Sequence, residues 1–195
     1  MMQQLLRTAG MILIAYSALY SAIWLHELGH ALVFQAYGCN EYLLVVVVPW
    51  HFANANPGPL DPDCLNALST ESLFLGGMGG IMMNILLAIS TYFFWKQTAA
   101  GPLRQWLLFF GISHLLEVAT YLTISNILPM SDMISVQEYE PLLRIPLFLA
   151  GVLMIWLIIR WIRQAPVPLK PALGWFSLCT ALSMGGLRLV FTYFA

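Results

Sequence analysis

Five apolar segments, each long enough to cross a lipid bilayer, dominate this sequence. A helix that spans the hydrocarbon core needs about 20 mostly apolar residues. Backbone N–H and C=O groups inside lipid must be satisfied within the segment, so a single spanning segment folds as a helix. We therefore expect an all-α integral membrane bundle whose five transmembrane helices cover residues 9–36, 72–95, 105–128, 142–159 and 172–194.

The composition agrees with a single membrane domain over residues 1–195. Hydrophobic residues make up 60% of the chain and charged residues 9%, whereas about 25% of residues are charged in soluble domains. The surface is therefore suited to contact with the lipid bilayer. The net charge of −1 provides no basic field for nucleic acid.

The longest connection, residues 38–71, follows the first span and contains the run LLVVVV. Valine is β-branched and favours strand over helix. Because the run is too short to span as a helix, we expect a short re-entrant β segment near residues 42–52, packed against protein. The edge of this segment could accept an unwound peptide by strand addition.

The three cysteines form no CxxC pair, which argues against a disulfide framework or a cysteine-based metal site. Cys39 and Cys64 lie in the same connection and could pair if it faces an oxidising compartment. The favoured interpretation is two unpaired thiols.

Lysine and arginine are concentrated in alternate connections, as expected for the cytoplasmic side of a membrane protein. Residues 38–71 contain none, and the third connection contains only Arg144. We therefore expect a multi-pass protein of the cell membrane with a cytoplasmic N-terminus. The basic residues on the expected cytoplasmic side are Arg7, Lys96, Arg104, Arg160, Arg163 and Lys170.

The sequence HELGH, residues 26–30, lies inside the first apolar segment. On a helix, His26 and His30 lie one turn apart on the same face, so both imidazoles can bind one Zn²⁺. Glu27 then lies close enough to act as the general base. Zinc lowers the pKa of a bound water to about 7, which makes a hydroxide nucleophile available at neutral pH. Ionisable groups at membrane depth are costly and indicate a functional site.

A catalytic zinc site needs a third protein ligand, and Asp132 is the first candidate. Pro129 interrupts the helix just before it, and the third span brings this region to the depth of HELGH. His114 and Glu117, on one face of the third span, provide either an alternative ligand or groups that orient the zinc histidines. An internal His–Glu pair is an equally good interpretation of these two residues, and His51 is a weaker ligand candidate.

The same residues resemble the site-2 protease family of intramembrane zinc metalloproteases. HELGH on a membrane helix is followed by Asn126 and Pro129 in an Asn-x-x-Pro pattern, with Asp132 beyond it. The segment from Gly80 to Asn84 is similar to the family's Gly-x-x-x-Asn element. The resemblance implies that His26, His30 and Asp132 bind zinc, that Glu27 is the catalytic base, and that Asn84 lies near the substrate.

We therefore predict a metalloprotease domain that cleaves a transmembrane or membrane-proximal peptide segment by zinc-activated water. Asn84 and Asn126 are expected to hold backbone groups of the unwound substrate. Two alternatives stay open. One is a membrane zinc hydrolase or metal carrier for a non-peptide substrate. The other is a scaffold in which the buried His–Glu–His cluster holds helices together by hydrogen bonds.

Overall fold

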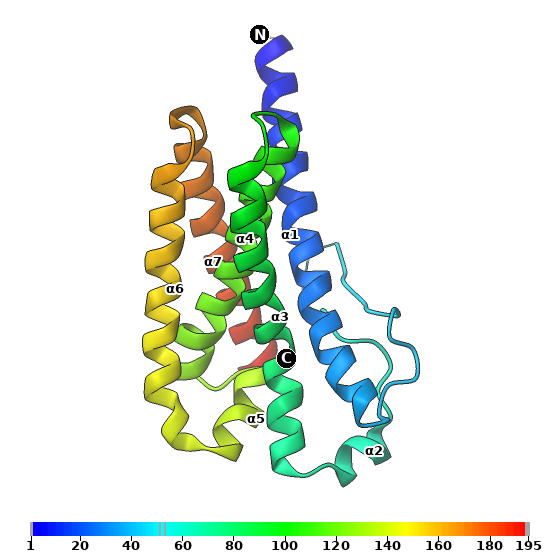
Figure 1. Ribbon diagram of the computed structural model, residues 1–195. Helices are drawn as coiled ribbons and strands as arrows, with labels where there is room; N and C mark the ends of the chain where they lie inside the picture. Colours follow the sequence, from blue (N-terminus) through cyan, green and yellow to red (C-terminus); the bar gives the residue numbers. More distant parts are fainter. Residues whose placement is uncertain (1, 51, 53, 194–195) are drawn as a thin grey trace.

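The computed structural model describes residues 2–50, 52 and 54–193, so His51, one of the residues considered as a ligand, lies outside the described part. Over these residues the fold is all-α, with seven α-helices (Figure 1). A π-helical turn, η1 (Tyr121–Ser125), continues α4, and the 3-10 turns η2 (Pro141–Leu143) and η3 (Val167–Leu169) precede α6 and α7. The α-helices are α1 (Met2–Ala36), α2 (Pro62–Ala67), α3 (Thr70–Gln97), α4 (Pro102–Thr120), α5 (Asp132–Tyr139), α6 (Arg144–Gln164) and α7 (Lys170–Tyr193).

Four helical segments are long and apolar enough to cross a membrane, which indicates a multi-pass membrane protein. They are Met2–Ala36, Thr70–Gln97, Pro102–Ser125 and Pro141–Gln164, and they correspond to the first four predicted spans. The fifth predicted segment does form a helix, α7. Over the described residues, however, α7 is not among the four. The prediction of five spans is confirmed for four.

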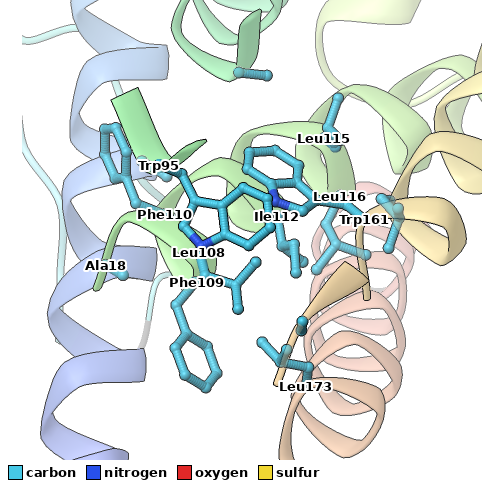
Figure 2. Packing of buried hydrophobic residues seen from close by; sticks show 14 of the residues in the cluster. Ala18, Trp95, Leu108, Phe109, Phe110, Ile112, Leu115, Leu116, Trp161 and Leu173 are labelled. Atoms are coloured by element: carbon cyan, nitrogen blue, oxygen red, sulfur yellow. The ribbon is translucent and has the colours of Figure 1, made fainter. Parts of the chain in front are cut away.

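Helix α4 is the centre of the bundle and is buried almost all round. Its Phe109 lies in an apolar cluster with residues from four other helices, Ala18 of α1, Trp95 of α3, Trp161 of α6 and Leu173 of α7 (Figure 2). The Trp95 and Trp161 rings meet edge to face, with centroids 5.8 Å apart. The bundle thus wraps α1, α3, α6 and α7 around one central apolar helix.

Helices α1 and α3 approach each other through glycines. A Cβ atom added at Gly29 would lie 2.5 Å from the carbonyl oxygen of Gly79, and one added at Gly79 would lie 2.6 Å from that of Gly29. Two backbones in direct contact leave no room for any side chain at these positions. Small residues at such spacings are how membrane helices reach close contact, as GGMGG (residues 76–80) predicts.

The predicted β segment near residues 42–52 is not formed, since the described part of this stretch contains a single isolated antiparallel bridge, between Val47 and Asn56. The stretch instead lies along α1, where Tyr20 donates a hydrogen bond to the Val48 carbonyl and Tyr16 to the Trp50 carbonyl. These two carbonyl groups therefore accept hydrogen bonds from tyrosine hydroxyls, where in a sheet they would accept them from a neighbouring strand. The strand edge predicted to receive substrate is therefore absent from the described residues.

Cys39 and Cys64 form a disulfide, so the expectation of two unpaired thiols is wrong. Gly38, with a positive φ of 80°, reverses the chain after α1. The Asp61 amide then donates to the Cys39 carbonyl at 3.0 Å, which brings the start of α2 beside Cys39. The two cysteines are 25 residues apart in the sequence, and nothing in that spacing predicts that the chain folds back to bring them together.

The contact between α1 and α3 predicts opposite effects for two Gly→Ala substitutions in the same helix. Gly29→Ala forces the two backbones apart, and overpacking of this kind lowers the free energy of unfolding by roughly 1–3 kcal/mol. Gly10→Ala is the matched control, because no atom lies within 4 Å of its added Cβ, and alanine in an open helical position is favourable by up to about 1 kcal/mol. Thermal unfolding in detergent checks both, and a Gly29→Ala protein as stable as wild type would contradict the close contact.

Candidate metal centre

Two histidines of α1 and the first residue of α5 meet in a buried cluster. The Nε2 atoms of His26 and His30 are 3.0 Å apart. The Asp132 Oδ2 atom lies 3.3 Å from the first and 3.2 Å from the second. The three donor atoms thus form a nearly equilateral triangle around a common point, as the HELGH spacing and the choice of Asp132 predict.

This triangle has the donor atoms and the spacing to hold a metal ion. Zinc binds imidazole nitrogen and carboxylate oxygen at about 2.0–2.2 Å, and tetrahedral angles then separate neighbouring ligand atoms by about 3.3 Å. The buried Oδ2 atom of Asp132 faces only the two imidazoles in the described part of the protein. A cation at the common point would bind this oxygen and both imidazole nitrogens at once.

The cluster lies almost entirely inside the protein. His26 and His30 are 1% and 4% exposed, while the Asp132 side chain is 17% exposed. Burial by itself raises the pKa of the Asp132 carboxyl, but the neighbouring His30 and His26 hold that pKa well below its ordinary value. Asp132 is therefore a carboxylate, the form that binds metal ions.

The orientation of the His30 ring is fixed by the backbone of α3. Its Nδ1 atom lies 2.7 Å from the Gly76 carbonyl oxygen, to which an Nδ1–H group donates. This hydrogen bond leaves the Nε2 lone pair directed at the cluster, which is the usual arrangement of metal-binding histidines.

Gly80 provides the space that both imidazole rings occupy. A Cβ atom at this position would lie 2.5 Å from His30 Nε2 and 2.6 Å from His26 Cε1. Any side chain here would displace the donor atoms, so the last glycine of GGMGG serves the cluster in addition to helix packing.

His26 is held by an amide that it shares with a second histidine. Asn84 Nδ2 lies 2.9 Å from His26 Nδ1, and Asn84 Oδ1 lies 2.7 Å from His114 Nδ1. The ring of Tyr121 stacks on the His26 ring at a centroid distance of 4.9 Å. The structure thus places His114 against Asn84 and away from the three donor atoms, while Asp132 faces the Nε2 atoms of His26 and His30.

Two buried glutamates accompany the cluster. Glu27 is 7% exposed and Glu117 is 1% exposed. The Glu27 carboxyl interacts electrostatically with both histidines, Asp132 and Glu117. Glu27 is therefore close to the three donor atoms without being one of them, which is the position expected of a general base.

An unusual backbone path delivers Asp132 to the cluster. The π-helical turn η1 ends α4, and π turns occur often at functional sites. Ser131 then adopts φ 51° and ψ −133°, a conformation that is costly for a residue with a side chain. This residue directly precedes Asp132, so the strain is located where α5 begins.

Asn126 occupies a different position from Asn84. Its amide nitrogen donates to the Arg144 carbonyl at 2.7 Å, and its Oδ1 atom accepts from Gln137 at 2.8 Å. These bonds tie the end of the π turn to α5 and α6. Asn126 therefore holds the segment that carries Asp132, and its contact with substrate stays a prediction, as does that of Asn84.

Several contributors to the cluster were not expected from the sequence. Gly76 contributes a carbonyl oxygen, Gly80 contributes space, and Tyr121 contributes a stacking ring. The GGMGG pattern predicts that α3 packs closely against a neighbouring helix. It does not predict that this neighbour is α1 with its two histidines. Comparison of the chain with known protein families, curated proteins and solved structures finds no match.

Asn84→Ala is expected to weaken metal binding without removing a ligand. Loss of the amide frees the His26 ring, and groups that orient metal ligands are worth about 10–100-fold in metal affinity. Chelator competition with purified protein measures the zinc dissociation constant. Ser90→Ala, an exposed position on the same helix, is the control and should bind as wild type. An Asn84→Ala protein with unchanged affinity would contradict the orienting role.

Proposed function

We propose that this chain is an intramembrane zinc endopeptidase, similar to the site-2 protease family, that cleaves a transmembrane or membrane-proximal peptide segment. The observation that carries the proposal is the triangle of His26, His30 and Asp132 donor atoms, 3.0–3.3 Å apart, beside Glu27 in a helix long and apolar enough to span a membrane. Two histidines and one carboxylate leave an open position, as catalytic zinc sites require.

Zinc is favoured over other cations by the accompanying glutamate. Two histidines and a carboxylate also suit Fe²⁺ in oxygenases. Those reactions, however, do not need a carboxylate in the residue after the first histidine. The HExxH arrangement on one helix face, with Glu27 buried at the cluster, instead suits hydrolysis.

In the proposed hydrolysis, each group at the site has a separate role. Bound zinc supplies Lewis acidity, which polarises a peptide carbonyl and makes a water molecule more acidic. Glu27 accepts a proton from the attacking water and donates it to the leaving amine. Gly76 and Asn84 keep the two imidazole rings in position, so that these groups need no rearrangement during the reaction.

The charge distribution and the disulfide support an active site in the extracytoplasmic half of the membrane. The Cys39–Cys64 disulfide lies at the α2 and α5 end of the bundle (Figure 1), and disulfides persist in oxidising compartments. The basic residues near the α3–α4 and α6–α7 connections lie at the opposite end, which suits the cytoplasm. We propose that the protein resides in the cell membrane with this orientation.

The first test is the metal content of the purified full-length protein, prepared without chelators. Wild type is expected to carry close to one zinc per chain. Asp132→Ala should bind zinc more than about 100-fold less tightly, because loss of an orienting partner alone costs 10–100-fold. Glu138→Ala changes an exposed acid on the same helix and should keep its zinc. Wild-type protein without metal would overturn the proposal.

The second test separates catalysis from metal binding. Glu27→Gln should retain zinc but cleave at least about 100-fold more slowly, which is the usual contribution of a general base. The probe is a set of end-labelled single-span peptides in detergent micelles, with new termini identified by mass spectrometry. Equal cleavage by wild type and Glu27→Gln would exclude Glu27 as the base. A zinc-loaded wild type that cleaves no peptide would favour a non-peptide substrate.

A further inference from the structure

A second feature of the bundle lies away from the metal cluster, between α3 and α6. These helices border a groove of about 480 Å³, whose lining also includes Leu115 of α4. This volume falls within the range of ligand sites, roughly 300–1,000 Å³. Most of the groove is lined by apolar side chains. These extend from Ile85 and Met154 at one end to Phe93 and Leu157 further along.

The other end of the groove is polar and positively charged. Arg160 and Gln164 line it on α6, and Tyr92 lines it on α3. The Tyr92 hydroxyl donates to Gln164 Oε1 at 3.3 Å. The Lys96 ammonium group lies 5.0 Å from the centre of the Tyr92 ring. Two cations and a hydroxyl group therefore gather at one end of an apolar groove.

These cations have no carboxylate partner in the described part of the protein. Neither Lys96 nor Arg160 forms a salt bridge there; the ion pairs found join Asp132 to the two histidines. Residues 72–116 and 141–195 contain no aspartate or glutamate at all. The positive charge at this end of the groove is therefore left for an external anion.

The charged end also lies at the level of lipid headgroups. Lys96 is in the last turn of α3, and Arg160 lies one turn before the end of α6 at Gln164. The Arg160 guanidinium stacks over the exposed Trp156 ring at 5.2 Å, and such aromatic residues mark the membrane interface. From Lys96 to Ile85 the groove follows α3 for about 16 Å, at 1.5 Å per residue, toward the middle of the span.

We propose that this groove binds one anionic phospholipid. The lipid phosphate lies between Lys96 and Arg160, and an acyl chain follows the apolar groove over Leu115. Basic sites between membrane helices on the cytoplasmic side recognise anionic headgroups in this way. A free phosphate would leave the apolar length uncovered, and an apolar helix would leave the two cations without an anion.

Two residues at the inner end of the groove are sequence neighbours of residues at the metal cluster. Ile85 directly follows Asn84, and Leu115 directly follows His114. A bound acyl chain thus supports the two helices whose side chains hold His26. The lipid site does not depend on the proposed protease activity, because binding is measured without cleavage.

Native mass spectrometry of the full-length protein in detergent tests the proposal with two probes, dioleoyl-phosphatidylglycerol and dioleoyl-phosphatidylcholine. Wild type should retain the anionic lipid preferentially. Each cation that contacts the phosphate is expected to contribute about fivefold in affinity, the size of one cation's attraction to an anionic membrane surface. Lys96→Gln and Arg160→Gln should therefore each weaken phosphatidylglycerol binding about fivefold, and the double variant about 25-fold. Arg163→Gln, an exposed charge on α6 outside the groove, should stay near wild type.

A second pair of variants tests the acyl chain. Ile89→Trp fills the groove from its exposed side and should lower the binding of both lipids, whereas Ile155→Trp on the exposed surface of α6, outside the groove, should not. The charge-conserving Lys96→Arg should bind phosphatidylglycerol as wild type, which separates loss of charge from misfolding. Equal retention of the two lipids by wild type, unchanged binding in the double variant, or unchanged binding in Ile89→Trp would each overturn the proposal.

Discussion

The direct backbone contact between α1 and α3 is the constraint on which the rest of the structure depends. Gly29 and Gly79 allow each helix to touch the carbonyl oxygen of the other. At this distance the Gly76 carbonyl reaches the His30 ring and Gly80 leaves room for both imidazoles. A side chain at Gly29 or Gly79 would meet the backbone of the other helix, and one at Gly80 would displace the imidazole rings. Close helix packing and the geometry of the cluster are therefore one property of this chain.

Much of the fold and the centre of the candidate site could be predicted from the sequence because both depend on short-range patterns. The length of the apolar segments predicted the four spanning helices, and the HExxH spacing predicted that His26 and His30 face each other. The disulfide, the path of residues 42–52 and the position of Asn84 could not be predicted in this way. Each depends on which helix faces which: Tyr16 and Tyr20 bond to carbonyls about 30 residues away in the sequence, and Asn84 joins histidines of two other helices.

The polar groups of the protein are divided along the bundle. Acidic residues, the disulfide and the metal cluster lie toward the end with α2 and α5, while Lys96 and Arg160 lie toward the end with the α3–α4 and α6–α7 connections (Figure 1). α4 passes between these regions with an apolar half, packed around Phe109, and a polar half that contains His114 and Glu117. This division explains why the central helix tolerates buried ionisable groups: they are confined to the half that adjoins the cluster.

The composition of the cluster and the backbone strain beside it both suit a bound cation. Asp132 enters as a carboxylate, and Glu27 and Glu117 are buried beside it, so two histidines face three acidic side chains. The π turn and the positive φ of Ser131 add backbone strain to bring Asp132 to this position, typically of order 1–3 kcal/mol. Helix packing alone needs neither this strain nor a carboxylate facing two imidazoles, whereas a divalent cation that binds all three donor atoms offsets the strain.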